Sequence, residues 1–241
     1  MFPKVERTII TTKALFTGLE RQPIDGGVVV EGDRIAYAGP RCGLEPYRSG
    51  STLIDAGDGL VCPGVIDSHL HLFLAAMNRS RFAAFCVGTC ARDCIDALAR
   101  VEDARPQDEF LLGYGWYHPL WREPELPDRS ELDRAYPTRP VCLMGADVHT
   151  LWLNGAALDL LGIHDDSVPP AGGIYRKDAA GHLTGIVQET AAFALLPRIY
   201  RLSAAEEAEA LGAFIADAHA CGITGVGDMA LFSAGGDRYA L

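Results

Sequence analysis

Two histidines separated by one residue are the clearest candidates for chemistry in this sequence. His69 and His71 follow Asp67 in the segment 63–71, PGVIDSHLH. Residues two apart in a strand point to the same face, so we expect these three side chains to lie together. Two neutral imidazole nitrogens on a rigid strand suit a divalent metal, with zinc the favoured ion. Asp67 would either ligate the same ion or orient the histidines.

The residues around this pair make the metal interpretation more specific than an isolated His-x-His would be. Val65–Asp67 reads as a short apolar strand that enters the histidines directly after Pro63-Gly64. The histidines therefore stand at the C-terminal end of a strand, where α/β barrels carry their catalytic groups. A divalent ion held there would lower the pKa of a bound water to about 7 and polarise a carbonyl.

The elements before the pair are predicted to form a small β domain over residues 1–62. This stretch is rich in β-branched residues and is interrupted by turn sequences such as Asp25-Gly26-Gly27 and Glu31-Gly32-Asp33. The strand-like segments are 8–12, 14–17, 27–31, 35–38, 52–55 and 60–62.

After residue 62 the pattern changes to mixed α/β. The predicted elements are a strand at 82–86, a helix at 89–101, a buried strand at 141–144, a helix at 151–161 and a hairpin at 172–187. Helices that alternate with buried strands are typical of a parallel α/β sheet. We therefore expect an α/β unit that follows the small β domain.

The last helix has the sharpest sequence signals. Ser203 and Glu206 form a predicted capping box, and Gly222 suits the position after the helix. We expect the core-facing stripe to contain the apolar residues Ala208, Leu211, Ile215 and Ala218. Residues 223–229 then read as a buried strand that contains Asp228.

Four further residues are candidates for the site. Glu189 and Asp228 are acidic residues at the ends of predicted strands, and either could act in catalysis. His149 follows a buried strand and is expected to contact substrate. Trp116 lies in the aromatic segment 113–121, and it belongs either to a substrate pocket or to a structural core.

Composition excludes several classes of function. The net charge of −11 argues against nucleic-acid binding and against an anionic membrane surface. The N-terminus lacks a signal-peptide pattern and no apolar run is long enough to span a bilayer. The seven cysteines include no Cys-x-x-Cys pair, which favours free thiols in a reducing cytoplasm. Cys90 and Cys94 are expected to act as small hydrophobic residues of a helix.

The motifs also carry a resemblance. The segment 63–71 resembles the first barrel strand of the amidohydrolase superfamily, and the β-rich start resembles the small sandwich domain beside that barrel. The later segments resemble the amidohydrolase-3 group, which includes YtcJ-like proteins and N-substituted formamide deformylases. These segments are 115–121, 147–158, 172–176, 184–189 and 222–228.

This resemblance implies a fold and an activity. The fold would be α/β, with an N-terminal β-sandwich segment and a partial TIM-type barrel over 63–241 that carries an α+β insertion at about 75–172. The activity would be metal-dependent hydrolysis of a non-peptide carbon–nitrogen bond in a small amide or formamide. The resemblance also implies a lysine, two more histidines and a late aspartate as site residues, and these are not identified in this sequence.

Length leaves alternatives open. A complete barrel needs about 250 residues, so we expect this chain to supply only the N-terminal part of one. It is then either part of an enzyme or a non-catalytic relic or binding module that retains the histidine pair. A dihydropyrimidinase-like cyclic amidase shares the opening motif but fits the aromatic segment less well. Open sheet edges would favour self-association into a homo-oligomer.

Overall fold

The computed structural model describes residues 6–104 and 109–229, and it divides into two compact units. The first unit ends at Val65 and the second begins at Ile66, close to the predicted boundary at residue 62. No helix of the described residues is long and apolar enough to cross a membrane.

The first unit is built on one five-stranded sheet with strand order β3-β2-β1-β4, in which β5 also pairs with β1. Its elements are β1 (Arg7–Leu15), β2 (Ile24–Glu31), β3 (Arg34–Pro40), the 3-10 helix η1 (Arg41–Tyr47), β4 (Thr52–Asp55) and β5 (Leu60–Val61). The two strands predicted between residues 8 and 17 are one strand, β1, whose register with β2 shifts between Thr12 and Leu15. A local bulge, rather than a turn, accounts for the break in the sequence pattern.

A helix, not a second sheet, covers this sheet. Ile9 and Val29 from the sheet pack against Leu44 of η1, and all three side chains are buried. Gly27 permits this approach, because a side chain there would meet Leu44 at 2.8 Å. The described residues of this unit therefore form one sheet covered by η1, and the predicted sandwich is not confirmed.

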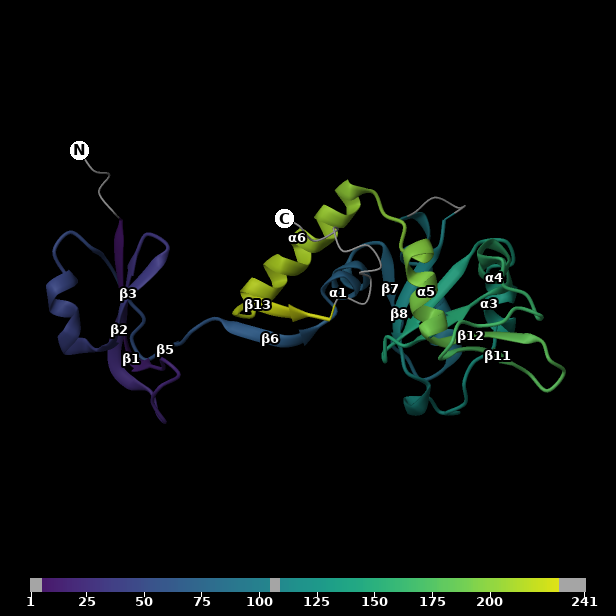
Figure 1. Cartoon of the computed structure of the whole chain (residues 1–241), viewed down its shortest axis with the longest axis horizontal. Helices are drawn as coiled ribbons and strands as arrows, with labels where there is room; N and C mark the ends of the chain where they lie inside the picture. Colours follow the sequence, from purple (N-terminus) through teal and green to yellow (C-terminus); the bar gives the residue numbers. More distant parts are fainter. Residues whose placement is uncertain (1–5, 105–108, 230–241) are drawn as a thin grey trace. The chain divides into compact units, whose positions relative to one another are not determined.

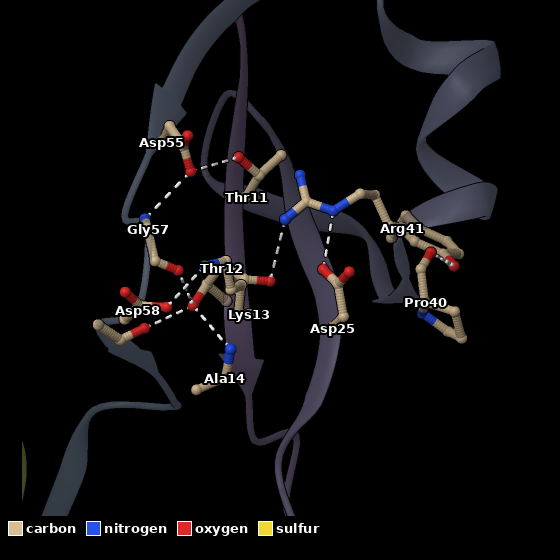
Figure 2. Close-up of polar contacts among 12 residues, drawn as sticks. Thr11, Thr12, Lys13, Ala14, Asp25, Pro40, Arg41, Asp55, Gly57 and Asp58 are labelled. Atoms are coloured by element: carbon tan, nitrogen blue, oxygen red, sulfur yellow. Dashed lines mark hydrogen bonds and ion pairs between the residues drawn. The ribbon is translucent and has the colours of Figure 1, made fainter.

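Polar contacts fasten the strands of the first unit to one another (Figure 2). The Asp55 carboxylate on β4 accepts hydrogen bonds from the Thr11 hydroxyl on β1 and from the Gly57 backbone. Both hydrogen bonds lower the pKa of Asp55, and the bond from Gly57 has the larger effect. Arg41 of η1 pairs with Asp25 of β2 at 2.8 Å, so η1 is held by charge as well as by packing.

The second unit is centred on a six-stranded mixed sheet with order β11-β12-β10-β9-β8-β7 (Figure 1). β7, β8 and β9 are parallel, and β10, β12 and β11 continue the sheet in antiparallel pairs. The strands are β7 (Ala83–Phe85), β8 (Leu111–Trp116), β9 (Val141–Gly145), β10 (Thr150–Leu153), β11 (Gly173–Lys177) and β12 (Leu183–Glu189). One sheet therefore runs from the predicted strand at 82–86 to the predicted hairpin at 172–187.

Helices bury both faces of this sheet, and the residues of the central strands alternate between the two cores. On β9, Cys142 and Met144 enter one core while Val141 and Leu143 enter the other. The first core is completed by α1 (Leu72–Arg79), α4 (Gly155–Leu161), α5 (Thr190–Ile199) and one side of α6 (Ala204–Ala220). The second core contains α2 (Ala91–Leu98) and α3 (Ser130–Ala135). The remaining short helices are η2 (Glu102–Ala104) and η3 (His118–Leu120).

The helix predicted over residues 151–161 is partly wrong. Its first three residues belong to strand β10, and the helix α4 begins only at Gly155. Asn154 separates the two elements, because its side chain caps α4 by accepting a hydrogen bond from the Ala157 backbone. Leu151 and Leu153 face one core and Trp152 the other, which is strand periodicity.

The capping box of α6 is confirmed, but its predicted core-facing stripe is wrong in part. Ser203 and Glu206 exchange the expected hydrogen bonds, and Gly222 follows the helix with a positive φ of 78°. Ala210 is the buried residue, and Leu211 and Phe214 pack against the core. Ala208 is exposed and Ile215 is 39% exposed. The helix therefore docks on a face rotated from the predicted one.

The strand that carries the histidine pair lies outside the six-stranded sheet. β6 (Val65–Leu70) pairs only with β13 (Ile223–Asp228) among the described residues. Val65 and Ile66 are 54% and 71% exposed, and β13 is also not buried, contrary to prediction. The described residues form no closed barrel, so the structure confirms a mixed α/β fold but not the predicted barrel.

Asn154 gives a direct test of this architecture. Its Oδ1 accepts from the backbone of Val141 and Ala157, and its Nδ2 donates to the carbonyls of Tyr136 and Arg139. Asn154→Ala should lower the free energy of unfolding by about 2–4 kcal/mol, because it removes a cap and leaves buried backbone groups unpaired. Ser203→Ala removes an exposed cap and should cost only about 1 kcal/mol. Urea denaturation of both variants measures the difference, and equal costs would contradict this role of Asn154.

Candidate metal and substrate site

The end of β6 is fixed by its pairing with β13. The Met229 amide donates to the Leu70 carbonyl, and the Asp228 carboxylate accepts from the Leu72 amide at 3.0 Å. Gly227 is required at this contact, because any side chain there would meet the Ser68 carbonyl oxygen at 2.8 Å. The residues of segment 222–228 thus set the position of the histidines on the neighbouring strand.

The structure brings the two histidine rings together. Their centroids lie 5.6 Å apart with the planes at 88°. His69 is exposed on β6, whereas His71 lies just beyond the strand, half-buried at the N-terminal end of α1. Asp67 accepts a hydrogen bond from the His69 backbone amide at 3.1 Å, so it supports the chain that carries the ring. Whether Asp67 also ligates a metal stays a prediction.

His71 is the more constrained of the two imidazoles. Its Nδ1 is buried and has no hydrogen-bond partner within the described residues. Burial is the larger cause that lowers the pKa of His71, and the nearby His69 lowers it further. Asp228 acts in the opposite direction. The neutral ring with a free lone pair is therefore favoured near neutral pH, which is the form that binds metals.

A cavity of about 550 Å³ opens beside the pair. Both histidines line it, together with side chains of α1 and with Phe85, Tyr114 and Val148 at one end of the six-stranded sheet. Most of its wall is apolar, and its polar side chains are those of His69, His71, Asn78, Arg79 and Tyr114. This composition is typical of small-molecule sites.

The donor set fits part of a metal site. His69 and His71 supply two nitrogens, one of them buried and without a hydrogen-bond partner among the residues that the structure describes. Within residues 6–104 and 109–229, however, no group of three or more histidine, cysteine or carboxylate side chains is close enough to hold an ion. Zinc sites in enzymes usually take three protein ligands, so the pair accounts for two of them.

His149 and Glu189 form a second polar group at the same end of the sheet. The His149 Nδ1 lies 2.9 Å from Glu189 Oε2, and the ring edge contacts Phe193 at a centroid distance of 4.9 Å. The two predicted catalytic candidates, Glu189 and Asp228, therefore make different contacts. Glu189 holds His149, while Asp228 caps the chain after His71.

Trp116 lies in the second core. Its ring is 2% exposed, it donates to the Leu143 carbonyl and it packs against Trp121 and Trp152. Of the two interpretations of the aromatic segment, the structure favours the structural core. Trp116 also lines a separate cavity of about 220 Å³ with His118 and Asp147, so a substrate contact there stays a prediction.

The cysteine series is structural. Cys86 and Cys94 are buried, and desolvation raises the pKa of each thiol to about 12. Cys90 is the N-cap residue of α2 and is half-buried, so it precedes the helix instead of lying within it as predicted. Neutral thiols in an apolar core behave as small hydrophobic residues rather than as metal ligands.

Comparison with known proteins places the chain in a family. The model of the amidohydrolase-3 group, described as the amidohydrolase family, matches residues 52–240. The chain is 32% identical over 213 residues to the putative amidohydrolase YtcJ of Bacillus subtilis. It is 30% identical over 218 residues to the N-substituted formamide deformylase of Arthrobacter pascens. The chain therefore belongs to the amidohydrolase family.

These similarities cover most of this chain but less than half of each relative. The two alignments span 88% of this chain and 40% of each relative. The crystal structure of an uncharacterized metal-dependent hydrolase from Pyrococcus horikoshii superposes with a TM-score of 0.60 at 21% identity. That superposition covers 92% of this chain and 42% of the other, and it shows a shared fold.

Sequence reasoning missed the residues that shape the turn before β10. Val148 has a φ of 55°, which is strained for a β-branched residue. Asp147 holds this turn, because its Oδ1 accepts from the amides of His149 and Thr150 and its Oδ2 from the Thr150 hydroxyl. An Asp three residues before a Thr was the available signal.

Removal of the Asp147 carboxylate should loosen the turn that presents His149. In Asp147→Ala, the His149 and Thr150 amides lose their acceptor, so their hydrogen–deuterium exchange should accelerate. In Asp147→Asn, the retained Oδ1 should preserve most of the protection. Unchanged exchange in the alanine variant would show that backbone packing alone holds the turn.

An exposed pair, His182 and Asp165, gives a prediction for pH. The hydrogen bond and charge of Asp165 raise the pKa of His182, and His182 lowers the pKa of Asp165. The pair's small stabilisation is complete below the unfolded pKa of histidine and is lost as pH rises through the folded pKa of His182. It is also lost in acid, as Asp165 protonates. NMR titration of Asp165→Asn should show the His182 midpoint move down, and an unchanged midpoint would contradict the pairing.

Proposed function

We propose that this chain carries part of the active site of a metal-dependent hydrolase that cleaves non-peptide carbon–nitrogen bonds of amides or formamides. The observation that carries the proposal is the pair of imidazoles at the end of β6, one with a buried nitrogen that has no hydrogen-bond partner in the described part of the chain. Family membership supports it. So does the similarity to a relative named as an N-substituted formamide deformylase.

In this proposal His69 and His71 hold a divalent cation, with zinc favoured by the nitrogen donors. When bound, such an ion supplies Lewis acidity that polarises a carbonyl and acidifies water. Asp228 fixes the backbone that follows His71 through its bond to the Leu72 amide. The apolar side chains of the 550 Å³ cavity would exclude bulk water from the reacting group.

A non-catalytic metal-binding module is the second candidate. It is favoured by the fact that the described residues bring only two ligands together. A metal held by two histidines without a complete catalytic set would then serve binding rather than turnover.

Metal binding and turnover separate the two candidates. The purified chain should bind one zinc ion by calorimetry and elemental analysis. His69→Ala and His71→Ala should each weaken binding by more than the roughly 10- to 100-fold that loss of a supporting residue costs. His164→Ala, at an exposed histidine, is the matched control and should bind as the native chain does.

Turnover is measured with 4-nitroformanilide, whose hydrolysis releases formate and coloured 4-nitroaniline. Zinc binding with turnover that both histidine variants abolish would support the hydrolase. Zinc binding without turnover would favour the binding module. A chain that is folded by circular dichroism yet binds no zinc would contradict both.

A further inference from the structure

His149 and Glu189 are joined twice, although 40 residues separate them in sequence. Their side chains meet through Nδ1 and Oε2 at 2.9 Å, and the Glu189 amide donates to the His149 carbonyl at 2.9 Å. Phe193 closes the other side of the imidazole with an edge contact at 4.9 Å. The ring is therefore held in one orientation by contacts from the end of β12 and from α5.

Backbone strain is concentrated at this pair. Within the described residues, Val148 and Glu189 are the two non-glycine residues with positive φ, at 55° and 57°. One precedes His149 and the other is its partner. Such conformations each cost about 1–3 kcal/mol and persist only where surrounding contacts impose them, commonly at functional sites.

Glu189 determines which imidazole nitrogen of His149 can accept a further hydrogen bond. An ionised carboxylate only accepts hydrogen bonds, so in the neutral imidazole the proton lies on Nδ1, facing Glu189. Nε2 then carries a lone pair and acts as an acceptor. The ring forms no other hydrogen bond within the described residues, and the side chain is 44% exposed.

His149 is adjacent in sequence to a residue of the histidine-lined cavity. Val148, the residue before His149, lines that cavity with His69 and His71. The turn that contains Val148 therefore brings the backbone of His149 beside this cavity.

We propose that Nε2 of His149 accepts a hydrogen bond from the N–H of the substrate amide, with Glu189 as the positioning residue. The inference rests on the proposed function and names its substrate class: secondary amides and formamides, which carry one N–H. A tertiary amide has no such donor and adds an alkyl group where the acceptor lies. The site would therefore discriminate against N,N-disubstituted substrates.

The test uses the whole chain and two probes, 4-nitroformanilide and N-methyl-4-nitroformanilide, each with and without zinc. The His149 ring is observed by nitrogen-detected NMR and assigned by its absence in His149→Gln. The secondary probe should shift the Nε2 resonance, and the N-methyl probe should not. His149→Ala should bind the secondary probe about three- to tenfold more weakly, as expected for one neutral hydrogen bond.

Glu189 is tested through the tautomer of His149, which a merely structural role would not alter. Glu189→Ala should move the neutral ring away from the Nδ1–H form, and Glu189→Gln, which keeps an acceptor oxygen, should preserve it. The exposed pair of His182 and Asp165, joined at 2.8 Å, provides the matched control. His182→Gln should leave probe binding unchanged.

Equal shifts with both probes, or no shift with either, would overturn the inference. So would a native ring in the Nε2–H form. These outcomes are independent of zinc binding. A shift specific to the secondary probe supports the role of His149 even if zinc fails to bind, and in that case the proposed function fails instead.

Discussion

Burial of both faces of the six-stranded sheet is the constraint on which the second unit depends. Alternate residues of β8, β9, β10 and β12 enter two separate hydrophobic cores, so neither face can hold an uncompensated polar group. Polar chemistry is consequently confined to the strand ends. The register brings the C-terminal ends of β7, β8, β9 and β12 and the start of β10 to the same end of the sheet. Val148, His149 and Glu189 lie at that end.

Burial of both sheet faces also explains why a strained backbone conformation persists in the turn between β9 and β10. The short connection between β9 and β10 must reverse the chain while both strands stay in register, and Asp147 holds it with three hydrogen bonds. Val148 takes up the strain with its positive φ. Energy from sheet packing thus maintains a turn that would not persist in isolation. The result is an imidazole that is fixed in direction while its side chain remains half exposed.

The histidine pair is organised differently. β6 belongs to a two-stranded ribbon with exposed apolar residues, and its position depends on close backbone contact with β13. Gly227 makes that contact possible, and Asp228 closes it at the Leu72 amide. The structure shows that His71, rather than His69, is the desolvated member of the pair.

Local signals in the sequence by themselves determined several structural elements of this protein and its family. Chemically distinctive patterns, such as the Ser203–Glu206 cap and the hairpin at residues 172–187, act over a few residues and were correctly predicted. The family followed from several such motifs in order.

Tertiary structure alone decided the features that depend on contacts between distant parts of the chain. Whether residues 151–153 form strand or helix depends on pairing with β9 and β12. The link between His149 and Glu189 joins residues 40 apart. Such contacts depend on chain topology, and no local periodicity encodes them.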